Sequence, residues 1–475
     1  MLHTRTIMAA RGIGFILCFL AGAALSAERE SNSARIQPWP ENPAYWQYQG
    51  KPILLLGGSD EDNLFNNPAL LEDNLVKMRA CGANYIRSTL SIRDEGNVAP
   101  YKMRGDKYDL DTFNPEFWNR LERSIRLMEK QDGIVQIEFW ATFDHYREFW
   151  INHPFNPAKN WDVTQENSRL LPKWDFHPAE RPQPFFFSVP GLNDDKVVLK
   201  YQEAYVRKVL DVTLPYPNVL YCLDNETRAP AEWAWYWGRF IQEEGKKRNT
   251  SIQVTEMWDD WDLRKEEHSR TYLHPDIFSF VDVSQNNWQI GQTHYDRLIE
   301  YRARLKSLPG GLRPMNNVKV YQRQGGRLPN DPAINIDRWW QNLFAGCAST
   351  RFHRPTGGIG LDEAAQQVIR AARHFTANFD VFHSEPLPKA LSDREENEAY
   401  CLAVADRAYA LYFPQGGEVV LALPREARLY TLRWFDPRRD EFLESQVSDS
   451  TESSWRLKSP ATGSTWLALV ERRVR

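Results

Sequence analysis

A short apolar segment that ends in three polar side chains is the part of the sequence best suited to chemistry. Residues 219–223, Val-Leu-Tyr-Cys-Leu, are followed directly by Asp224, Asn225 and Glu226. An apolar run of this length is typical of a strand buried on both faces of a parallel sheet. In a parallel barrel the carboxyl ends of the strands form the rim that carries the active site. A glutamate on that rim, beside an amide, suits proton donation to the leaving oxygen of a sugar. The structural alternative is that Asp224 and Asn225 only cap the helix that follows.

Eight expected strands, seven of them followed by an expected helix, make up most of the chain. The expected strands cover residues 53–58, 82–87, 133–140, 218–224, 251–256, 278–283, 317–321 and 346–351. The expected helices cover residues 68–80, 117–130, 197–212, 233–246, 295–305, 336–344 and 361–375. This order predicts an α/β fold, a (β/α)8 TIM barrel. A doubly wound sheet is the alternative, but no glycine-rich phosphate turn follows the first strand.

The pattern changes after residue 383. Short strands are expected at residues 398–404, 409–413, 418–423, 429–435, 454–457 and 465–470, with turns such as Pro414-Gln415-Gly416-Gly417 between them. Closely spaced strands separated by turns predict a small antiparallel β-sandwich. We therefore expect a barrel domain over residues 28–383 and a sandwich domain over residues 384–475.

Residues 1–27 resemble a secretory signal peptide. Arg5 and Arg11 precede an apolar run over residues 12–24, and small residues at 24–27 suit cleavage. The apolar run is short for a bilayer span, although a retained anchor is the alternative. No second long apolar segment follows. The sequence thus predicts a secreted or periplasmic protein with no membrane span after cleavage.

The composition narrows the classes of partner. The formal net charge is −4 and no basic tract is present, which argues against nucleic acid. The 18 Trp and 19 Tyr supply flat apolar rings that stack on sugars, although cores use them too. Cys81, Cys222, Cys347 and Cys401 form no C-x-x-C pair, so we expect buried free thiols rather than zinc ligands or disulfides. No metal or cofactor is expected, since the strand ends carry no His-x-x-x-His or Glu-x-x-His spacing; the alternative is that carboxylates alone hold Ca²⁺ or Mg²⁺.

The expected rim gathers acids, amides, cations and aromatic rings, which suit a carbohydrate substrate. The residues expected to contact it are Arg87, Glu138, Trp140, Asp144, Asn225, Trp258, Asn286, Asn287, Tyr321 and His353. Arg87 and His353 also have structural alternatives, as an orienting cation and a buried histidine. An aromatic insertion over residues 144–195 either lines this rim or packs over the barrel.

These features resemble the large clan of retaining (β/α)8 glycoside hydrolases. The resemblance rests on Asn225-Glu226 at the end of the fourth strand and on Arg87 at the second. It implies that Glu226 is the catalytic acid/base and that Asn225 holds a substrate hydroxyl. The carboxyl-terminal segments, residues 412–417 and 434–437, resemble bacterial secreted proteins with a collagen-binding-type β-sandwich.

One departure from the clan concerns the second catalytic residue. The clan ends its seventh strand with a nucleophilic glutamate, whereas this chain has Val-Tyr-Gln-Arg-Gln-Gly over residues 320–325. Glu256 is the first candidate to replace it, followed by Asp144 and Glu138. Alternatively Tyr321 is nucleophilic, the enzyme inverts configuration with a more distant base, or the site binds without cleavage.

The predicted function is therefore a secreted glycoside hydrolase that uses Glu226 and Glu256. The alternative is a non-catalytic carbohydrate- or matrix-binding protein, which the missing seventh-strand acid favours. A polysaccharide lyase stays open because the rim also carries arginines and His353.

Overall fold

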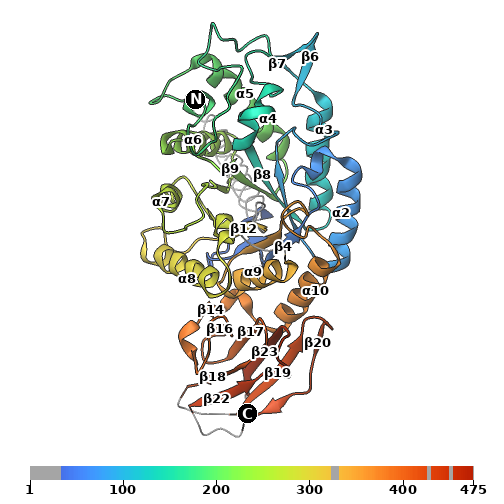
Figure 1. Ribbon diagram of the computed structural model, residues 1–475, viewed down its shortest axis with the longest axis vertical. Helices are drawn as coiled ribbons and strands as arrows, with labels where there is room; N and C mark the ends of the chain where they lie inside the picture. Colours follow the sequence, from blue (N-terminus) through green and yellow to red (C-terminus); the bar gives the residue numbers. More distant parts are fainter. Residues whose placement is uncertain (1–33, 322–330, 425–428, 449–452, 474–475) are drawn as a thin grey trace, which may run out of the picture.

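The computed structural model describes residues 34–321, 331–424, 429–448 and 453–473. It consists of a strand–helix barrel with an antiparallel domain stacked against one side (Figure 1). The expected signal segment, residues 1–27, lies outside these ranges. Within them, no helix has the length and hydrophobicity needed to cross a bilayer.

Eight parallel strands form the barrel and confirm the predicted fold. They are β4 (Leu55–Gly58), β5 (Tyr85–Thr89), β8 (Ile134–Ala141), β9 (Val219–Asn225), β10 (Val254–Thr255), β11 (Val281–Asp282), β12 (Met315–Val320) and β13 (Ser349–Phe352). The sheet order is β10-β9-β8-β5-β4-β13-β12-β11. The backbone N–H of Ser279 donates to the carbonyl of Val254 at 3.1 Å, which joins the two ends of the sheet.

The helices lie outside this barrel (Figure 1). They are α2 (Pro68–Cys81), α3 (Pro115–Glu129), α4 (Arg147–Ile151), α5 (Lys196–Thr213), α6 (Ala231–Lys247), α7 (Glu266–Tyr272), α8 (Gly291–Ser307), α9 (Pro332–Phe344) and α10 (Glu363–Asn378). Side chains of Asn67, Asn114, Asp195, Asp331 and Asp362 accept backbone N–H bonds at the starts of α2, α3, α5, α9 and α10. Asn and Asp are effective N-caps because they satisfy N–H groups that have no partner within the helix.

Two barrel strands are shorter than their apolar runs suggest. β10 and β11 have two residues each. Side-chain hydroxyls take the place of ladder bonds there: the N–H of Val254 donates to Ser279 Oγ, and Thr255 Oγ1 donates to the carbonyl of Phe280. The loop between β5 and α3 also contains a hairpin, β6 (Tyr101–Arg104) and β7 (Lys107–Phe113).

The carboxyl-terminal domain has two antiparallel sheets. The larger sheet contains β14 (Glu385–Pro386), β16 (Tyr400–Val404), β17 (Ala408–Phe413), β19 (Tyr430–Asp436), β20 (Glu441–Phe442), β21 (Gln446–Val447) and β23 (Trp466–Arg472). The smaller sheet contains β15 (Leu391–Ser392), β18 (Glu418–Ala422) and β22 (Ser454–Lys458). The six predicted strands correspond to β16, β17, β18, β19, β22 and β23, while the two-residue strands β14, β15, β20 and β21 were not predicted; together they confirm an antiparallel domain after the barrel.

This domain packs against the barrel helices α8, α9 and α10 (Figure 1). Tyr412 stacks on Trp340 with ring centroids 5.9 Å apart, and its hydroxyl donates to Asp337 at 2.8 Å. Phe435 lies 5.7 Å from Phe375. Buried residues of both domains belong to one continuous hydrophobic cluster. The interface is therefore built as a core, which suits bracing of the barrel.

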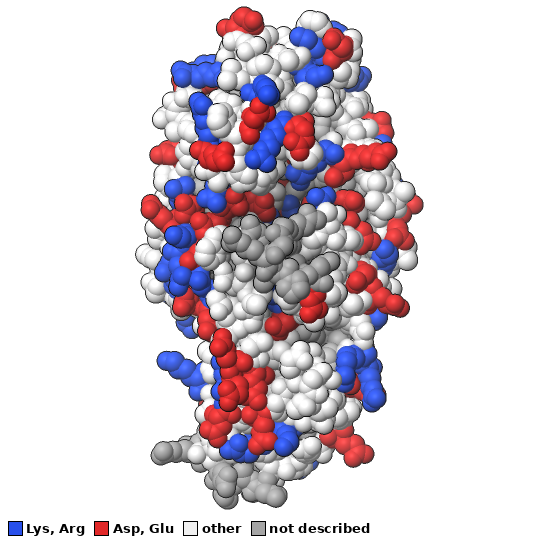
Figure 2. Space-filling view, in the orientation of Figure 1, with Lys and Arg blue, Asp and Glu red and all other residues white. Residues whose placement is uncertain are grey.

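The four cysteines Cys81, Cys222, Cys347 and Cys401 are free and buried, as predicted. Figure 2 shows Lys and Arg interspersed with Asp and Glu over the visible face.

Candidate active site in the barrel mouth

A cavity of about 340 Å³ opens among the carboxyl ends of the barrel strands. Its lining contains acids, cations and aromatic rings: Asp62, Arg87, Arg93, Asp94, Phe143, Phe149, Asn225, Glu226, Lys319, Tyr321, His353 and Arg354. This is the position in which a (β/α)8 barrel carries its chemistry, because the strand-to-helix loops meet there.

Glu226 follows β9 directly and turns its carboxylate into this cavity. Its backbone has a left-handed φ of 60°, a conformation that non-glycine residues adopt mainly where the surroundings enforce it. Gln285 donates to Glu226 Oε1 at 2.9 Å, and the Lys319 ammonium forms an ion pair with the same oxygen. Lys319 also donates to Asn225 Oδ1 at 2.9 Å. The Glu226 side chain keeps 20% of its surface exposed, against 3% for Lys319. The carboxylate is therefore fixed through one oxygen while still reaching solvent.

The surroundings keep Glu226 ionised. Burial opposes the charge, but Lys319, Gln285 and Arg87 together outweigh burial and lower the pKa of Glu226 to about 2. An ionised carboxylate can accept a proton or attack a carbon atom, but it cannot donate a proton. In this unliganded arrangement Glu226 is thus better suited to the part of a base or nucleophile than to the predicted part of a proton donor.

Arg87 connects the acids on one side of the cavity. Its guanidinium contacts Glu138 at 2.8 Å and Asp62 at 3.2 Å, and donates to Asn225 Oδ1 at 3.0 Å. Despite burial, Arg87 and nearby cations hold the pKa of Asp62 below its usual range. Arg87 therefore orients Asn225 from behind. The Asn225 oxygen accepts from both Arg87 and Lys319, which turns its NH2 group toward other acceptors.

A closed layer of acids lies beneath this cavity and contains Glu256. Glu256 Oε1 accepts from the backbone N–H groups of Asp224 at 3.0 Å and Met257 at 2.9 Å. The side chain is buried and does not line the cavity. Burial, followed by the charge of Asp224, raises the pKa of Glu256 well above its usual value. Burial also raises the pKa of Asp224 to about 8. Glu256 thus ties β9 to β10, away from the position expected for a second catalytic carboxylate.

The remaining predicted residues divide between the cavity and its supports. Arg87, Asn225, Glu226, Tyr321 and His353 line the cavity. Burial lowers the pKa of His353 to about 3, so its ring is neutral. Tyr321 donates to Gln285 Oε1 at 3.4 Å, and burial followed by the Glu226 charge raises its pKa, which keeps the phenol protonated.

Glu138, Trp140, Asp144, Trp258, Asn286 and Asn287 do not line this cavity. Asp144 pairs with Arg93 at 3.0 Å. Trp140 packs on Trp233, and Trp258 Nε1 donates to Thr271 at 2.8 Å. Asn286 donates to the carbonyl of His294, and Asn287 donates to the carbonyl of Lys319. These side chains hold the walls of the mouth together.

Several cavity residues were not among the predicted site residues. Lys319, Arg93, Arg354, Phe143 and Phe149 all face the cavity. Successive side chains of a strand point to opposite faces, so residues two positions apart along β12 and its continuation point to the same face. Tyr321 was predicted to face the mouth, and Lys319 stands two positions before it. The sequence already places Lys319, Arg93 and Arg354 at or just after predicted strand ends, and the spacing from Tyr321 is the signal that Lys319 contacts the mouth.

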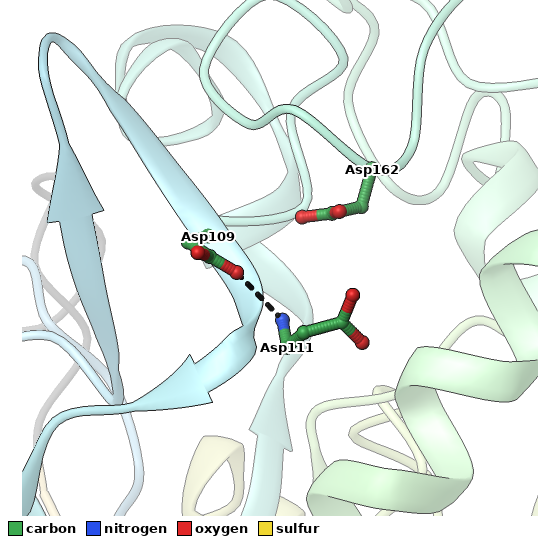
Figure 3. A group of neighbouring side chains, drawn as sticks. All are labelled: Asp109, Asp111 and Asp162. Carbon is green, nitrogen blue, oxygen red and sulfur yellow. Dashed lines mark hydrogen bonds between the residues drawn. The ribbon is translucent and has the colours of Figure 1, made fainter.

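A separate acidic group lies near the β6–β7 hairpin (Figure 3). The carboxylates of Asp109, Asp111 and Asp162 approach within 4.8 Å of one another. Asp109 accepts from the N–H of Asp111 at 3.1 Å, and Asp162 accepts from the N–H of Leu110 at 2.8 Å. Lys200 lies 3.6 Å from Asp111. Backbone donors and Lys200 account for this close approach.

The comparisons with known proteins support the fold. No protein-family profile and no curated protein sequence matches this chain. Among solved structures, a glycoside hydrolase family 5 protein from Bacteroides vulgatus ATCC 8482 matches with a TM-score of 0.64 and 10% identity, covering 93% of this chain and 95% of that one. A second structure described as a glycoside hydrolase matches with a TM-score of 0.61 and 11% identity, covering 93% and 98%. An α-amylase from Geobacillus thermoleovorans, complexed with acarbose, matches with a TM-score of 0.55 and 14% identity, covering 87% and 93%. At these identities the likeness is one of fold.

Proposed function

We propose that this protein is a glycoside hydrolase, secreted or periplasmic, that cleaves O-glycosidic bonds of an oligo- or polysaccharide in the barrel mouth. The observation that carries the proposal is the Glu226 carboxylate, held through Oε1 by Lys319 and Gln285 and facing an open cavity of about 340 Å³. Fixed carboxylates that face a substrate cleft are the working groups of glycoside hydrolysis.

The rest of the lining suits a sugar. Phe143 and Phe149 present aromatic surface, and rings of this kind pack against the apolar face of a pyranose. Asn225, with its oxygen already held by Arg87 and Lys319, offers its NH2 group to a hydroxyl. Carbohydrate recognition combines apolar area with a few placed polar groups, as found here.

The first experiment replaces the proposed reacting carboxylate. Glu226→Gln keeps the size of the side chain and an oxygen for Gln285 or Lys319, but removes the charge. We expect hydrolysis to fall by about 10²–10⁴-fold, the usual contribution of an acid–base group. The measurement is release of reducing ends from a panel of plant, algal and bacterial polysaccharides. The control is Glu243→Gln, an exposed residue of α6. Equal activity of Glu226→Gln and wild type on a cleaved glycan would end the assignment.

A second candidate function is glycan binding without cleavage. It is favoured by one observation: the last part of β12 presents the ammonium of Lys319, which neutralises Glu226. Affinity electrophoresis on the same polysaccharides separates the two functions. Retardation of the wild type by a glycan, together with no release of reducing ends from any of the panel, would favour binding over hydrolysis.

A further inference from the structure

Hydrolysis by the usual two-carboxylate route needs a second acid near Glu226. The identity of that acid is an inference that rests on the proposed function. Lys319 occupies the end of β12 and contacts Glu226 and Asn225. The partner must therefore come from another strand end. On the β8 side, Glu138 pairs with Arg87 at 2.8 Å and Asp144 pairs with Arg93 at 3.0 Å, and neither acidic side chain is more than 7% exposed. Further acids near the mouth, among the described residues, include Asp62, Asp94, Glu256 and Asp259.

Two of these are already engaged by several cations or donors. Asp62 has 3% of its side chain exposed and contacts Arg87 at 3.2 Å and Arg354 at 3.4 Å. Asp94 accepts from Asn63 at 2.9 Å and pairs with Arg354 at 3.5 Å on the opposite side of the mouth, in the loop after β5. Neither lies in a loop next to Glu226 in the sheet order, where β9 is flanked by β8 and β10.

Strand register separates Glu256 from Asp259. β10 pairs with β9 so that Val254 lies beside Tyr221 and Thr255 beside Cys222, which places Glu256 level with Leu223. That is three residues below Glu226, or about 10 Å at the usual rise of a strand. Beyond β10, a parallel bridge joins Trp258 to Thr227, and the N–H of Asp259 donates to the carbonyl of Thr227 at 3.1 Å. Asp259 therefore stands at the level of the rim, beside the segment that carries Glu226.

The side chain of Asp259 is partly exposed at that level, just outside the residues that line the cavity. It keeps 22% of its surface exposed, and Arg228 contacts its Oδ2 at 3.0 Å. Burial and then the charge of Glu226 raise the pKa of Asp259, whereas Lys319 lowers that of Glu226. Two carboxylates whose surroundings push their pKa values apart form a natural acid–base pair.

We propose that Asp259 is the proton donor of the reaction and that Glu226 is its ionised partner. The simplest balanced step breaks the bond between the anomeric carbon and the glycosidic oxygen. The electron pair leaves with that oxygen, which takes the proton of Asp259. The oxygen of a water molecule bonds to the anomeric carbon, and one water proton passes to Glu226. Proton return from Glu226 to Asp259 through solvent completes the cycle, so one water is consumed for each bond cleaved.

The test exploits the leaving group. An oligosaccharide cleaved by the wild type needs a proton on its leaving oxygen, whereas 2,4-dinitrophenolate of the matching aryl glycoside leaves without one. For Asp259→Asn we expect a loss of about 10²–10⁴-fold on the oligosaccharide and less than about tenfold on the dinitrophenyl glycoside. Glu226→Gln should lose activity on both. Asp259→Glu, which restores an acid, should recover part of the oligosaccharide activity.

Matched controls keep the outcome clear. Asparagine at 259 retains an oxygen for Arg228, and Asp260→Asn changes the neighbouring acid, whose Oδ1 only accepts the N–H of Asp262. Equal melting temperatures of Asp259→Asn and Asp260→Asn would exclude a folding defect. If wild type cleaves the oligosaccharide and Asp259→Asn is equally active, or loses equally on both substrates, the role of Asp259 is refuted while the hydrolase stands. If wild type cleaves no glycan, the proposed function fails and the pairing fails with it.

Discussion

Carboxyl groups have opposite pKa shifts in the open mouth of the barrel and in the closed layer directly beneath it. In the mouth, Glu226 and Asp62 face Lys319 and Arg87, and these cations lower the carboxyl pKa values. In the closed layer, Glu256 and Asp224 meet burial and each other, and their pKa values rise. Glu226 and Asp62 in the mouth are thus charged and fixed, whereas Glu256 and Asp224 beneath it act as neutral hydrogen-bonding groups; Asp259 at the rim, whose pKa is also raised, is the exception that the proposed proton transfer uses. The environment of an acid, rather than the number of acids in a region, therefore indicates where the reaction takes place.

Lys319 is the residue on which this contrast depends. It belongs to β12, has 3% of its side chain exposed, and reaches Glu226 and Asn225 from the interior. Removing one partner of a buried ion pair is costly because the other charge is left without compensation. Lys319→Met therefore tests whether Lys319 is what keeps the pKa of Glu226 low, in contrast to the raised pKa values in the layer below.

The largest expected effect is that of Lys319→Met. Without the ammonium, only Gln285 and Arg87 oppose the burial of Glu226, so its pKa should rise from about 2. Activity that needs the ionised carboxylate should then fall as pH drops through this higher pKa. We expect the acidic limb of the kcat/KM profile to move upward by about one pH unit or more, the usual effect of removing an adjacent opposite charge. The measurement is the pH–rate profile on a cleaved glycan.

The control for this change is Lys77→Met on α2. Lys77 pairs with Asp60 at 2.7 Å, but its side chain is 31% exposed. A pair of this kind contributes about 0–1 kcal/mol to stability, and it lies outside the cavity. An unmoved acidic limb in Lys319→Met, or an equal shift in Lys77→Met, would contradict the role given to Lys319.

The next effect concerns the closed layer. Burial raises the pKa of Asp224 to about 8 in the folded state, against an ordinary value of 3.8. A group with a raised folded pKa contributes stability below pH 4 that is lost progressively as pH rises toward 8. Asn at this position cannot ionise, so Asp224→Asn should gain stability relative to wild type between pH 5 and pH 8. A gain of at least about 1 kcal/mol is expected, since each pKa unit corresponds to about 1.4 kcal/mol.

Chemical denaturation at the two pH values measures this gain. Asp211→Asn is the matched control, because Asp211 pairs with Arg248 at 2.7 Å with 55% of its side chain exposed. Its stability difference from wild type should be the same at both pH values. If Asp224→Asn also runs parallel to wild type, Asp224 titrates normally and the contrast between the two layers is lost.

The barrel was predictable because its signals are local. The apolar run at residues 219–223 is β9, and Asn or Asp caps mark where α2 and α5 begin. The lengths of β10 and β11 were not predictable, since hydroxyl groups of Ser279 and Thr255 replace ladder bonds and depend on tertiary contacts. The short α7 was not predicted either.

The sequence predicted which residues lie near the strand ends, but not how high each of them lies relative to the rim. Asn225 ends β9 and Glu226 follows it, whereas Arg87 lies two residues before the end of β5 and still lines the cavity. Glu256 also follows its strand, yet the pairing of β10 with β9 places it about three residues lower. Sequence order fixes which residues are near a rim, whereas the stagger between neighbouring strands decides which of them lie above it. No local pattern encodes that stagger.

The smallest expected effect tests whether the aromatic rim belongs to the mouth. Phe149, in α4, lines the cavity with 42% of its surface exposed, and the Arg93 guanidinium lies 5.8 Å from its ring centroid. Phe176 is equally exposed at 42%, but it packs beside Trp174 and is not part of the lining. Loss of one aromatic contact costs about 0.5–1.5 kcal/mol, or about two- to twelvefold in affinity. We therefore expect Phe149→Ala to raise KM by this factor with kcat little changed, and Phe176→Ala to leave both unchanged. Equal exposure makes the stability effects of the two substitutions comparable, so a shared change in KM would show that the insertion only covers the barrel.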